Sequence, residues 1–328
     1  MHSRPLGSTG LHVTPIGLGL AALGRPAYID LGRAEDIGED RGVGAMRARC
    51  HEVLDAAWQA GIRYVDAARS YGRAEAFLAD WLDGRPEVAG GLTVGSKWGY
   101  TYVADWRADA EVHEVKDHSV AALRRQREES LALIGDHLAL YQVHSATLDS
   151  GVLQDRDVHR ELARLRDERG IVIGLSVSGP RQADTIRRAR EVVVDRSPVF
   201  TCVQATWNPL EPSAGDALAL VHDEGWGVIV KEALANGRLV GREPGPVADI
   251  LDASAQRLGA TADQVALAAA LAQPWADVVL SGAVAPAQVR SNAAAVETQL
   301  DERALRDLAG LAEPAERYWS HRATLAWA

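Results

Sequence analysis

The sequence has very little cysteine and no apolar run long enough to cross a membrane. Cys50 and Cys202 are its two cysteines among 328 residues, and no Cys-X-X-Cys pair occurs. This argues against a disulfide framework and a thiolate zinc site, and it fits a cytosolic setting. The first residues lack the apolar core of a signal peptide, and no run approaches the ~18 apolar residues of a membrane span. We therefore expect a cytoplasmic protein without a membrane partner.

A concentrated basic patch is also missing. The chain has 35 Lys and Arg against 45 Asp and Glu, which gives a net charge of −10. Nucleic acids and anionic membranes require clustered positive charge, so neither is an expected partner. No P-loop, Gly-X-Ser-X-Gly elbow or EF-hand loop occurs, and the histidines of residues 113–118 are five apart, where a zincin motif needs four. We expect a small-molecule partner and no metal; the oligomeric state stays open.

No linker rich in Pro, Gly or Ser divides the chain, so residues 1–328 are expected to form one domain. Short β-prone apolar runs alternate with longer segments of helical period. The predicted strands cover residues 16–20, 63–67, 92–97, 138–144, 171–177, 199–207, 227–231 and 278–282. The predicted helices cover residues 44–60, 73–82, 118–133, 157–169, 181–194, 214–224, 246–258, 261–272 and 300–311, followed by an irregular tail.

Eight strands that alternate with helices favour an α/β fold of the (β/α)8 TIM-barrel type. A doubly wound sheet is the alternative, but its Gly-rich first turn is incomplete here, since Gly17, Gly19 and Gly24 lack the required spacing. Residues 4–15 predict a β-hairpin ahead of the first strand. The polar insert of residues 25–43 is acidic and is expected to be a solvated loop.

Four polar residues follow the carboxyl ends of neighbouring predicted strands. Asp66, Lys97 and His144 end the second, third and fourth strands, and Tyr71 lies in the loop after Asp66. In a barrel these ends meet on the face that carries the active site. A Lys–Asp pair is usually a surface ion pair and a single strand-end His is usually structural, but all four at one end favour catalysis.

The set suits reduction of a carbonyl group by hydride transfer, because the developing alkoxide must be protonated. A tyrosine has a pKa of ~10 and is a poor acid-base group at neutral pH unless its phenolate is stabilised. Lys97 would stabilise it, and Asp66 would hold Lys97 in place. To lower the pKa of Tyr71 by ~2–3 units, Lys97 would have to stabilise the phenolate by ~3–4 kcal/mol. His144 would donate to the carbonyl oxygen.

Residues 61–75, which read GIRYVDAARSYGRAE, resemble the signature segment of the aldo-keto reductase superfamily. The resemblance runs along nearly the whole chain, from residues 6–11 through 173–176 and 208–210 to Asn292. It implies a (β/α)8 barrel with long substrate loops that binds NADPH, or less often NADH. It also implies that Tyr71 is the proton donor of an oxidoreductase that interconverts small aldehydes or ketones and their alcohols.

The resemblance further implies a cofactor site along the carboxyl face. The implied cofactor-binding residues are Gly19, Leu20, Asp66, Ser176, Gln204, Lys231, Leu234, Gly237, Arg238, Gly282, Gln288 and Asn292. Three positions depart from the common pattern. Val177 replaces an Asn, and Lys231 replaces a Tyr that stacks on the nicotinamide, where it either influences charge near the ring or pairs with an acid. Val284 replaces an Arg that clamps the 2′-phosphate of NADPH, and Arg238 or Arg290 are the candidate substitutes.

Nine tryptophans against two phenylalanines predict an aromatic substrate pocket. The expected substrate residues are Trp98, Tyr100, Trp207 and Trp319, and the tail of residues 312–328 is expected to close over the pocket. Such a pocket suits an aromatic carbonyl compound or a keto-sugar. Since the superfamily also includes channel-associated members, a nicotinamide-binding regulatory subunit with little turnover is the alternative function.

Overall fold

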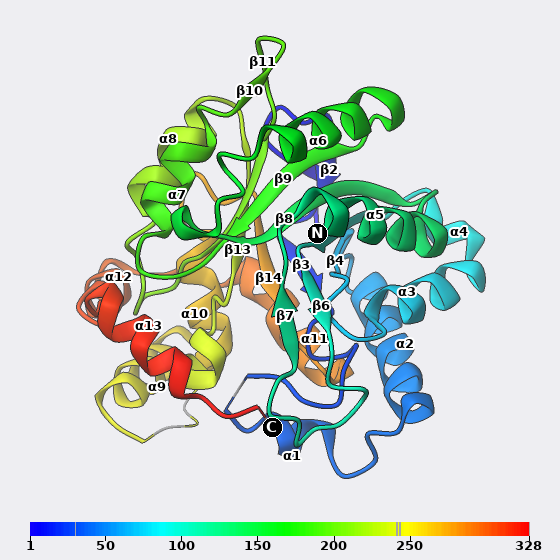
Figure 1. Cartoon of the computed structure of the whole chain (residues 1–328). Coiled ribbons are helices and arrows are strands. Elements are labelled where there is room, and N and C mark those ends of the chain that lie inside the picture. Colours follow the sequence, from blue (N-terminus) through cyan, green and yellow to red (C-terminus); the bar gives the residue numbers. More distant parts are fainter. Residues whose placement is uncertain (30, 241, 243, 328) are drawn as a thin grey trace.

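The computed structural model describes residues 1–29, 31–240, 242 and 244–327, and a closed barrel of eight parallel strands forms its centre (Figure 1). The barrel strands are β3 (Ile16–Gly19), β4 (Tyr64–Asp66), β5 (Thr93–Trp98), β8 (Leu138–Ala146), β9 (Val172–Val177), β12 (Cys202–Thr206), β13 (Gly227–Lys231) and β14 (Val278–Ser281). Each pairs with the next in chain order, and β14 pairs with β3 to close the ring. The predicted (β/α)8 barrel is confirmed.

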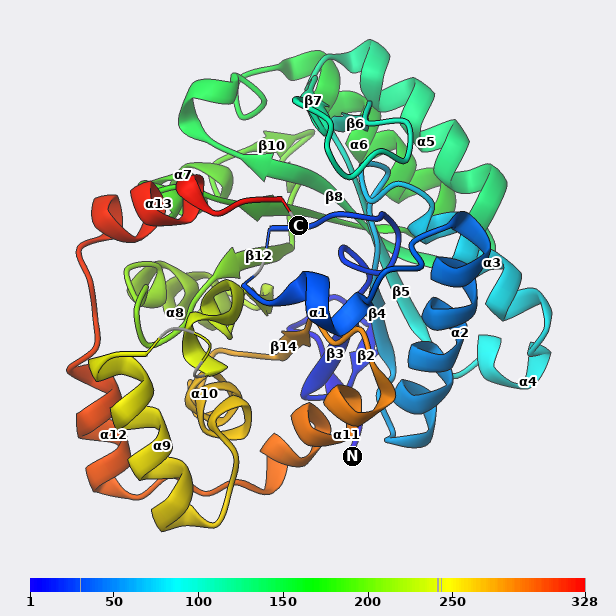
Figure 2. The same cartoon turned by 90° about the horizontal axis from the view of Figure 1, so that it is seen from below.

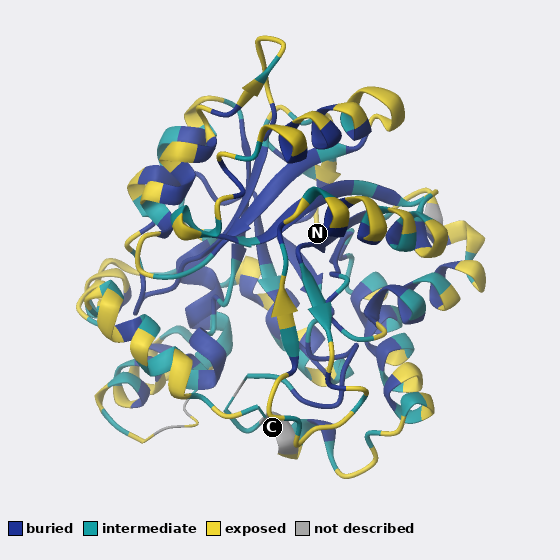
Figure 3. Ribbon diagram, in the orientation of Figure 1, coloured by how far each residue is buried: buried dark blue, intermediate teal, exposed yellow. Residues whose placement is uncertain are grey.

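A helix follows each barrel strand and covers the outside of the sheet (Figure 2). These helices are α2 (Val43–Gln59), α3 (Ala74–Asp83), α5 (Val120–Ile134), α6 (Arg156–Arg169), α7 (Gln182–Ala189), α8 (Gly215–Asp223), α10 (Ala262–Leu271) and α11 (Pro286–Ala294). The buried residues of α2 include Met46, Cys50, Val53 and Leu54, which recur at intervals of three or four and so form one apolar face. Figure 3 shows the strands buried and the helices buried on their inner side.

Local signals set the ends of the helices. Helix α6 begins after Asp155, whose carboxylate accepts hydrogen bonds from the backbone N–H groups of Asp157 and Val158 at 2.9 and 3.1 Å. The same helix ends at Gly170, which has a φ of 67°, a backbone conformation that favours glycine. Gly170 thus turns the chain toward β9, as the sequence pattern predicted.

Some predicted bounds and elements differ from the structure. The helix predicted over residues 181–194 ends at Ala189, because residues 193–198 form the hairpin of β10 (Val193–Val194) and β11 (Ser197–Pro198). Helix α11 was not predicted, because its small and polar residues do not place apolar side chains at helical intervals. The tail predicted as irregular contains α13 (Ala315–Thr324), which buries Tyr318 against a second apolar cluster.

Further elements decorate the barrel. The predicted N-terminal hairpin is present as β1 (Arg4–Pro5) and β2 (His12–Val13). The remaining elements are α1 (Arg33–Ile37), α4 (Pro86–Ala89), β6 (Tyr100–Tyr102), β7 (Glu114–Lys116), α9 (Pro246–Leu258), α12 (Glu302–Ala309) and the 3-10 helices η1 (Leu148–Ser150), η2 (Ala235–Val240) and η3 (Ala295–Glu297). Figure 2 looks onto the end of the barrel where α1 and the C-terminus lie.

The insert of residues 25–43 is not simply a solvated loop. It forms the short helix α1, and both Arg25 and Ile37 are buried. The backbone N–H of Leu31 donates to the carbonyl oxygen of Asn236 at 3.0 Å, and the Asn236 side chain donates to the carbonyl oxygen of Ile29 at 2.9 Å. The insert therefore packs on η2, across the carboxyl end of the barrel.

The described residues contain neither a membrane-spanning helix nor a cluster of metal-ligating side chains. None of the helices in that part of the chain is both long and apolar enough to span a membrane. Nowhere in the same residues do three or more His, Cys, Asp or Glu side chains gather as a metal site would require.

Candidate active site

Asp66, Tyr71 and Lys97 meet at the carboxyl end of the barrel. The Lys97 ammonium donates hydrogen bonds to the Asp66 carboxylate, to the backbone carbonyl oxygen of Ala67 at 3.0 Å and to the Tyr71 hydroxyl at 3.4 Å. The Lys97 side chain is fully buried, and a buried ammonium is stable only with such partners. The residues predicted from the strand ends are therefore brought together as one hydrogen-bonded group.

The carboxylate of Asp66 also binds amide and hydroxyl groups from across the barrel. Its Oδ1 accepts from Gln204 Nε2 at 2.9 Å, from the Tyr64 hydroxyl at 3.3 Å and from Gln142 Nε2 at 3.4 Å. With Lys97 on Oδ2, both carboxylate oxygens are satisfied. The carboxylate of Asp66 thus fixes the position of the Lys97 ammonium in the buried site.

The loop that carries Tyr71 is held by a buried carboxylate on α3. Glu75 accepts from the Ser96 and Ser130 hydroxyls at 2.6 and 2.7 Å and from Arg69 Nη1 at 2.5 Å. The loop also turns at Gly72, which has a φ of 60°, and a Cβ there would lie 2.4 Å from the carbonyl oxygen of Gly24. A side chain at this turn would push the loop off the first βα loop and displace Tyr71.

The pKa of Tyr71 is raised well above its ordinary value, first by burial and then by the negative charge of Asp66, while Arg25 acts in the opposite direction. This differs from the expected lowering by Lys97. The reason is that Asp66 neutralises Lys97 at close range, so that burial dominates. Tyr71 is therefore a neutral phenol at physiological pH, which is the form that can donate a proton.

His144 lies beside Tyr71 at the end of β8. The two rings meet edge to face with centroids 5.4 Å apart, and His144 Nδ1 lies 3.3 Å from the Ser70 hydroxyl. Burial, and then the positive charges of Lys97, Arg25 and Lys231, lower the pKa of His144 well below its usual value. The imidazole is therefore neutral and carries one N–H donor.

Arg25 is a member of this group that no sequence motif singled out. Its guanidinium donates to Glu114 at 2.9 Å and to the carbonyl oxygen of Ser70 at 3.1 Å, and it is 2% exposed. Its Cζ lies 4.7 Å from the ring centroid of Trp327. Arg25 comes from the long insert, so its place depends on how that insert folds back over the barrel.

Lys231 and Glu232 carry a second set of charges at the end of β13. Lys231 donates to the Thr206 hydroxyl at 2.8 Å, and burial lowers its pKa to about 8. Glu232 pairs instead with Arg322 of α13, which donates to both carboxylate oxygens at 2.5–3.0 Å. Burial by itself would raise the pKa of Glu232, but the charges of Arg322 and Lys231 and the hydrogen bonds from Arg322 and Thr206 together lower it to about 2.

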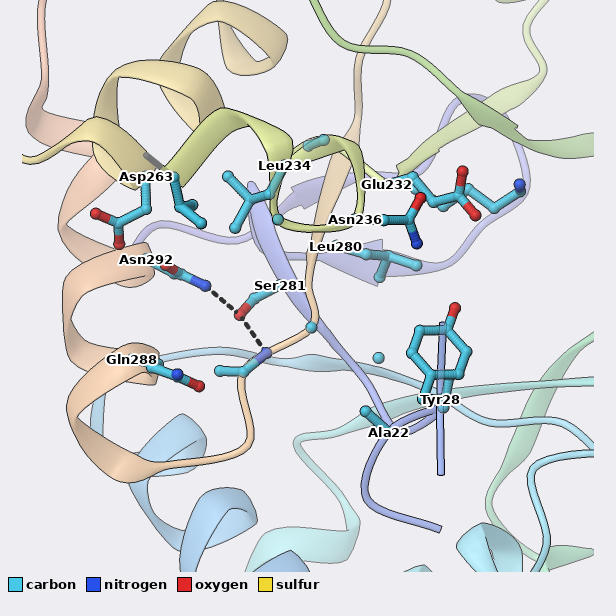
Figure 4. Close-up of a pocket in the computed structure, with 18 of the residues that line it drawn as sticks. Ala22, Tyr28, Glu232, Leu234, Asn236, Asp263, Leu280, Ser281, Gln288 and Asn292 are labelled. Atoms are coloured by element: carbon cyan, nitrogen blue, oxygen red, sulfur yellow. Dashed lines mark hydrogen bonds between the residues drawn. The ribbon is translucent and has the colours of Figure 1, made fainter. Parts of the chain in front are cut away.

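A cavity of about 440 Å³ extends from this group along the carboxyl face, a volume in the range of small-molecule and cofactor pockets. Nine of the residues expected to bind cofactor line it: Gly19, Asp66, Gln204, Lys231, Leu234, Gly237, Gly282, Gln288 and Asn292. Figure 4 shows Asp263, Gln288 and Asn292 toward one end and Tyr28 and Glu232 toward the other.

Three residues expected at the cofactor are placed elsewhere. Leu20 is fully buried in the barrel core, and the Ser176 hydroxyl accepts from the backbone N–H of Ser145 at 2.8 Å. Arg238 pairs with Glu313 through bonds of 2.6 and 3.2 Å. None of these three side chains lines the cavity.

The cavity fits a ligand with hydrogen-bond donors. Asn236 lines it, and the side-chain oxygen of this residue is buried without a hydrogen-bond partner in the described structure. A buried amide oxygen left unpaired costs about 1–3 kcal/mol, so its position beside a cavity points to a bound polar molecule.

The four predicted substrate residues do not form one wall. Tyr100 meets His144 edge to face at 5.1 Å, and Trp319 lies 5.7 Å from Lys231 Nζ, so both are near the site. Trp98 is fully buried, and Trp207 packs against Trp275. The ring of Trp98 packs against His118, and none of the four predicted side chains is among the residues that line the cavity.

Solved structures of aldo-keto reductases have the same fold as this chain. A protein from Pseudomonas aeruginosa that is assigned to the aldo-keto reductases superposes with a TM-score of 0.64 at 26% identity, over 93% of this chain and 95% of that one. An aldo-keto reductase from Bacillus halodurans, in its holo form, superposes with a TM-score of 0.70 over 96% and 97%. Its identity of 24% supports the shared fold alone.

Pyridoxal 4-dehydrogenase from Microbacterium luteolum is 32% identical over 174 residues, or 48% of this chain and 45% of that protein. An uncharacterised oxidoreductase from Bacillus subtilis, YqkF, is 25% identical over 166 residues, or 49% and 45%. The matches thus span less than half of these curated relatives. A model of the aldo/keto reductase family matches residues 15–313, which is most of the chain. This protein belongs to the aldo/keto reductase family.

Proposed function

We propose that this protein interconverts a carbonyl compound and its alcohol, with a nicotinamide dinucleotide as the hydride carrier and Tyr71 as the group that moves the proton. The observation that carries the proposal is the hydrogen-bonded group in which Lys97 contacts both Tyr71 and Asp66 at the edge of the cavity. Family membership and the names of the curated relatives support it.

The lining of the cavity suggests how the dinucleotide would be held. When bound, this group supplies or accepts a hydride at its nicotinamide ring. Asp66, Gln204 and Lys231 would surround the ring, since they lie at the Tyr71 end of the cavity. The unpaired side-chain oxygen of Asn236 would accept a hydrogen bond from a ribose hydroxyl, and Gln288 would meet the far end of the molecule.

In the reduction direction the carbonyl carbon gains the hydride and the carbonyl oxygen takes the proton of the Tyr71 hydroxyl. The neutral phenol is the correct form for this step, and its raised pKa keeps it protonated. The phenolate left behind is stabilised by the Lys97 ammonium and the Arg25 guanidinium, until solvent returns the proton. Neutral His144 would donate its N–H to the carbonyl oxygen and orient it.

An aromatic carbonyl compound is the substrate class that these side chains favour. The edge of Tyr100 faces His144, while Tyr28 and Trp327 contact the Arg25 guanidinium beside Tyr71. Aromatic edges and a guanidinium together bind a flat ring. One relative is named for pyridoxal, an aromatic aldehyde. The tail would close over this substrate, since Trp327 stacks on His113 at 4.2 Å.

The test is a Tyr71→Phe variant assayed by nicotinamide absorbance on a panel of pyridoxal, substituted benzaldehydes and keto-sugars. We expect kcat to fall at least about 100-fold, because the proton donor is lost. The matched control is Tyr141→Phe, which removes a buried hydroxyl outside the cavity and should keep activity within about twofold of the parent. Activity of Tyr71→Phe within about tenfold of the parent would show that Tyr71 is not the donor.

A further inference from the structure

We propose that the cavity selects NAD(H) over NADP(H), because Asp263 lines the end that receives the adenosine ribose and no unpaired cation in the described structure lines that end. This inference rests on the proposed function, which places a nicotinamide dinucleotide in the cavity. It differs from the family resemblance, which implies NADPH. The two cofactors differ at the 2′ position of the adenosine ribose, where NADH has a hydroxyl and NADPH has a phosphate.

The position of Tyr71 sets the direction in which a dinucleotide would lie. Hydride and proton reach the same carbonyl group, so the nicotinamide must lie at the end lined by Asp66, Tyr71 and Gln204. The adenosine must then extend away from Tyr71. Figure 4 shows Asp263, Gln288 and Asn292 at the end of the cavity away from Tyr28, and Tyr28 and Tyr71 both contact the Arg25 guanidinium.

The side chains at the adenosine end are acidic or uncharged. Asp263 lies in the first turn of α10, and its Oδ1 accepts a hydrogen bond from the Thr261 hydroxyl. Its Oδ2 is left to accept from a ribose hydroxyl, which is the contact by which acidic residues bind the 2′-hydroxyl of NAD. A 2′-phosphate at this place would bring about two negative charges against the carboxylate.

The uncharged side chains of this wall, Gln288 and Asn292, use some of their hydrogen-bonding groups within the protein. Gln288 Oε1 accepts from the backbone N–H of Val284 at 2.9 Å, which leaves the Gln288 amide N–H₂ for the ligand. The Asn292 amide donates to the Ser281 hydroxyl at 2.8 Å. Val284 itself is 1% exposed and packs in the barrel core, so it presents nothing to the cavity.

The arginines near this end have other partners or lie outside the cavity. Arg242 lines the cavity but pairs with Asp36 at 2.7 Å, and Arg238 pairs with Glu313 through two hydrogen bonds. The Arg238 side chain is 10% exposed and that of Glu313 is 14% exposed, so separating this pair would leave two poorly solvated charges. Arg290 is an exposed residue of α11 that does not line the cavity. A 2′-phosphate would thus lack the bidentate partner that it needs.

The first experiment titrates the full chain separately with NADH and NADPH and follows the quenching of tryptophan fluorescence. We expect NADH to bind at least about tenfold more tightly than NADPH. Equal or tighter binding of NADPH would overturn the selectivity while leaving the proposed function standing. Failure of both nucleotides to bind would overturn the proposed function and the selectivity with it.

A substitution then tests the role of the carboxylate. Asp263→Asn should weaken NADH binding and strengthen NADPH binding, so that the ratio of their dissociation constants moves at least about fivefold toward NADPH. The matched control is Asp249→Asn, which removes an exposed acid from the first turn of α9, outside the cavity, and should leave the ratio unchanged. An unchanged ratio in Asp263→Asn would overturn the assignment.

Discussion

The guanidinium carbon of Arg25 lies 5.2 Å from the ring centroid of Tyr71, on an insert that joins the first strand of the barrel to its first covering helix. Arg25 also holds the backbone next to Tyr71, since it donates to the carbonyl oxygen of Ser70. The positive charge of Lys97 is largely offset by the negative charge of Asp66. The positive charge of Arg25 is therefore the one that acts to lower the pKa of Tyr71. In the proposed mechanism Arg25 would therefore position Tyr71 and stabilise its phenolate.

Replacing Arg25 by Gln should change the pH dependence of the reaction as well as its rate. In the proposed mechanism alcohol oxidation needs the Tyr71 phenolate, and loss of the cation raises the pKa of Tyr71 further. We expect the pH at which oxidation reaches half of its maximum to rise by about one unit, and kcat at neutral pH to fall about tenfold. Steady-state oxidation rates measured as a function of pH check this.

The control for this prediction is Arg47→Gln, which removes a largely exposed arginine of α2 that pairs with Asp80. Its oxidation profile should superimpose on that of the parent. A fall in rate for Arg25→Gln with an unshifted profile would mean that Arg25 supports the loop but does not influence the phenolate.

Lys231 should make the binding of oxidised nicotinamide nucleotide depend on pH. Its pKa is lowered to about 8, so the ammonium is charged below that pH and neutral above it. The oxidised nicotinamide ring is itself a cation, whereas the reduced ring is neutral. We expect the dissociation constant of the oxidised form to fall about threefold or more from about pH 7 to about pH 9, as the repulsion disappears.

Lys231→Met should flatten this dependence and bind the oxidised form more tightly at neutral pH. The reduced nucleotide is the internal control, because its affinity should vary much less over the same range. Parallel pH profiles for the two nucleotides in the parent protein would contradict a role for the Lys231 charge.

Arg322→Ala should destabilise the protein because it leaves Glu232 buried without its ionic partner. The Glu232 side chain is 8% exposed and that of Arg322 is 24% exposed. Removal of one member of a buried pair costs about 3–5 kcal/mol, and we expect the lower end because Arg322 is partly solvated. Urea denaturation at neutral pH measures the free energy of unfolding.

The pH dependence of this contribution has a definite sign. The pKa of Glu232 is lowered from 4.5 to about 2, so the pair stabilises the fold fully above the unfolded value and loses its effect as pH falls toward 2. The difference in the free energy of unfolding between parent and variant should therefore shrink as the pH falls from 4.5 toward about 2. The control, Arg306→Ala, breaks an exposed pair with Glu302 and should cost less than about 0.5 kcal/mol. An equal cost for both variants would contradict the prediction.

The barrel and the core of the site could be predicted from the amino-acid sequence. Apolar runs alternate with amphipathic segments over the whole chain, and this periodicity specifies strands and helices through local burial. Asp66, Lys97 and His144 each end such a run, and parallel strands carry their ends to one face of a barrel. Their meeting with Tyr71 thus follows from chain order, which is why these four residues were predicted correctly as neighbours.

The surroundings of that core could not be predicted in this way, because they depend on how distant segments pack. Arg25, Glu232 and Arg322 come from an insert, a strand end and a terminal helix, and no periodic pattern fixes how such segments fold back over the barrel. The structure likewise pairs Arg238 with Glu313, although the sequence suggested it for the cofactor. The direction in which the pKa of Tyr71 is shifted depends on burial and on every charge within a few ångströms. Both are set only when distant segments of the chain pack together.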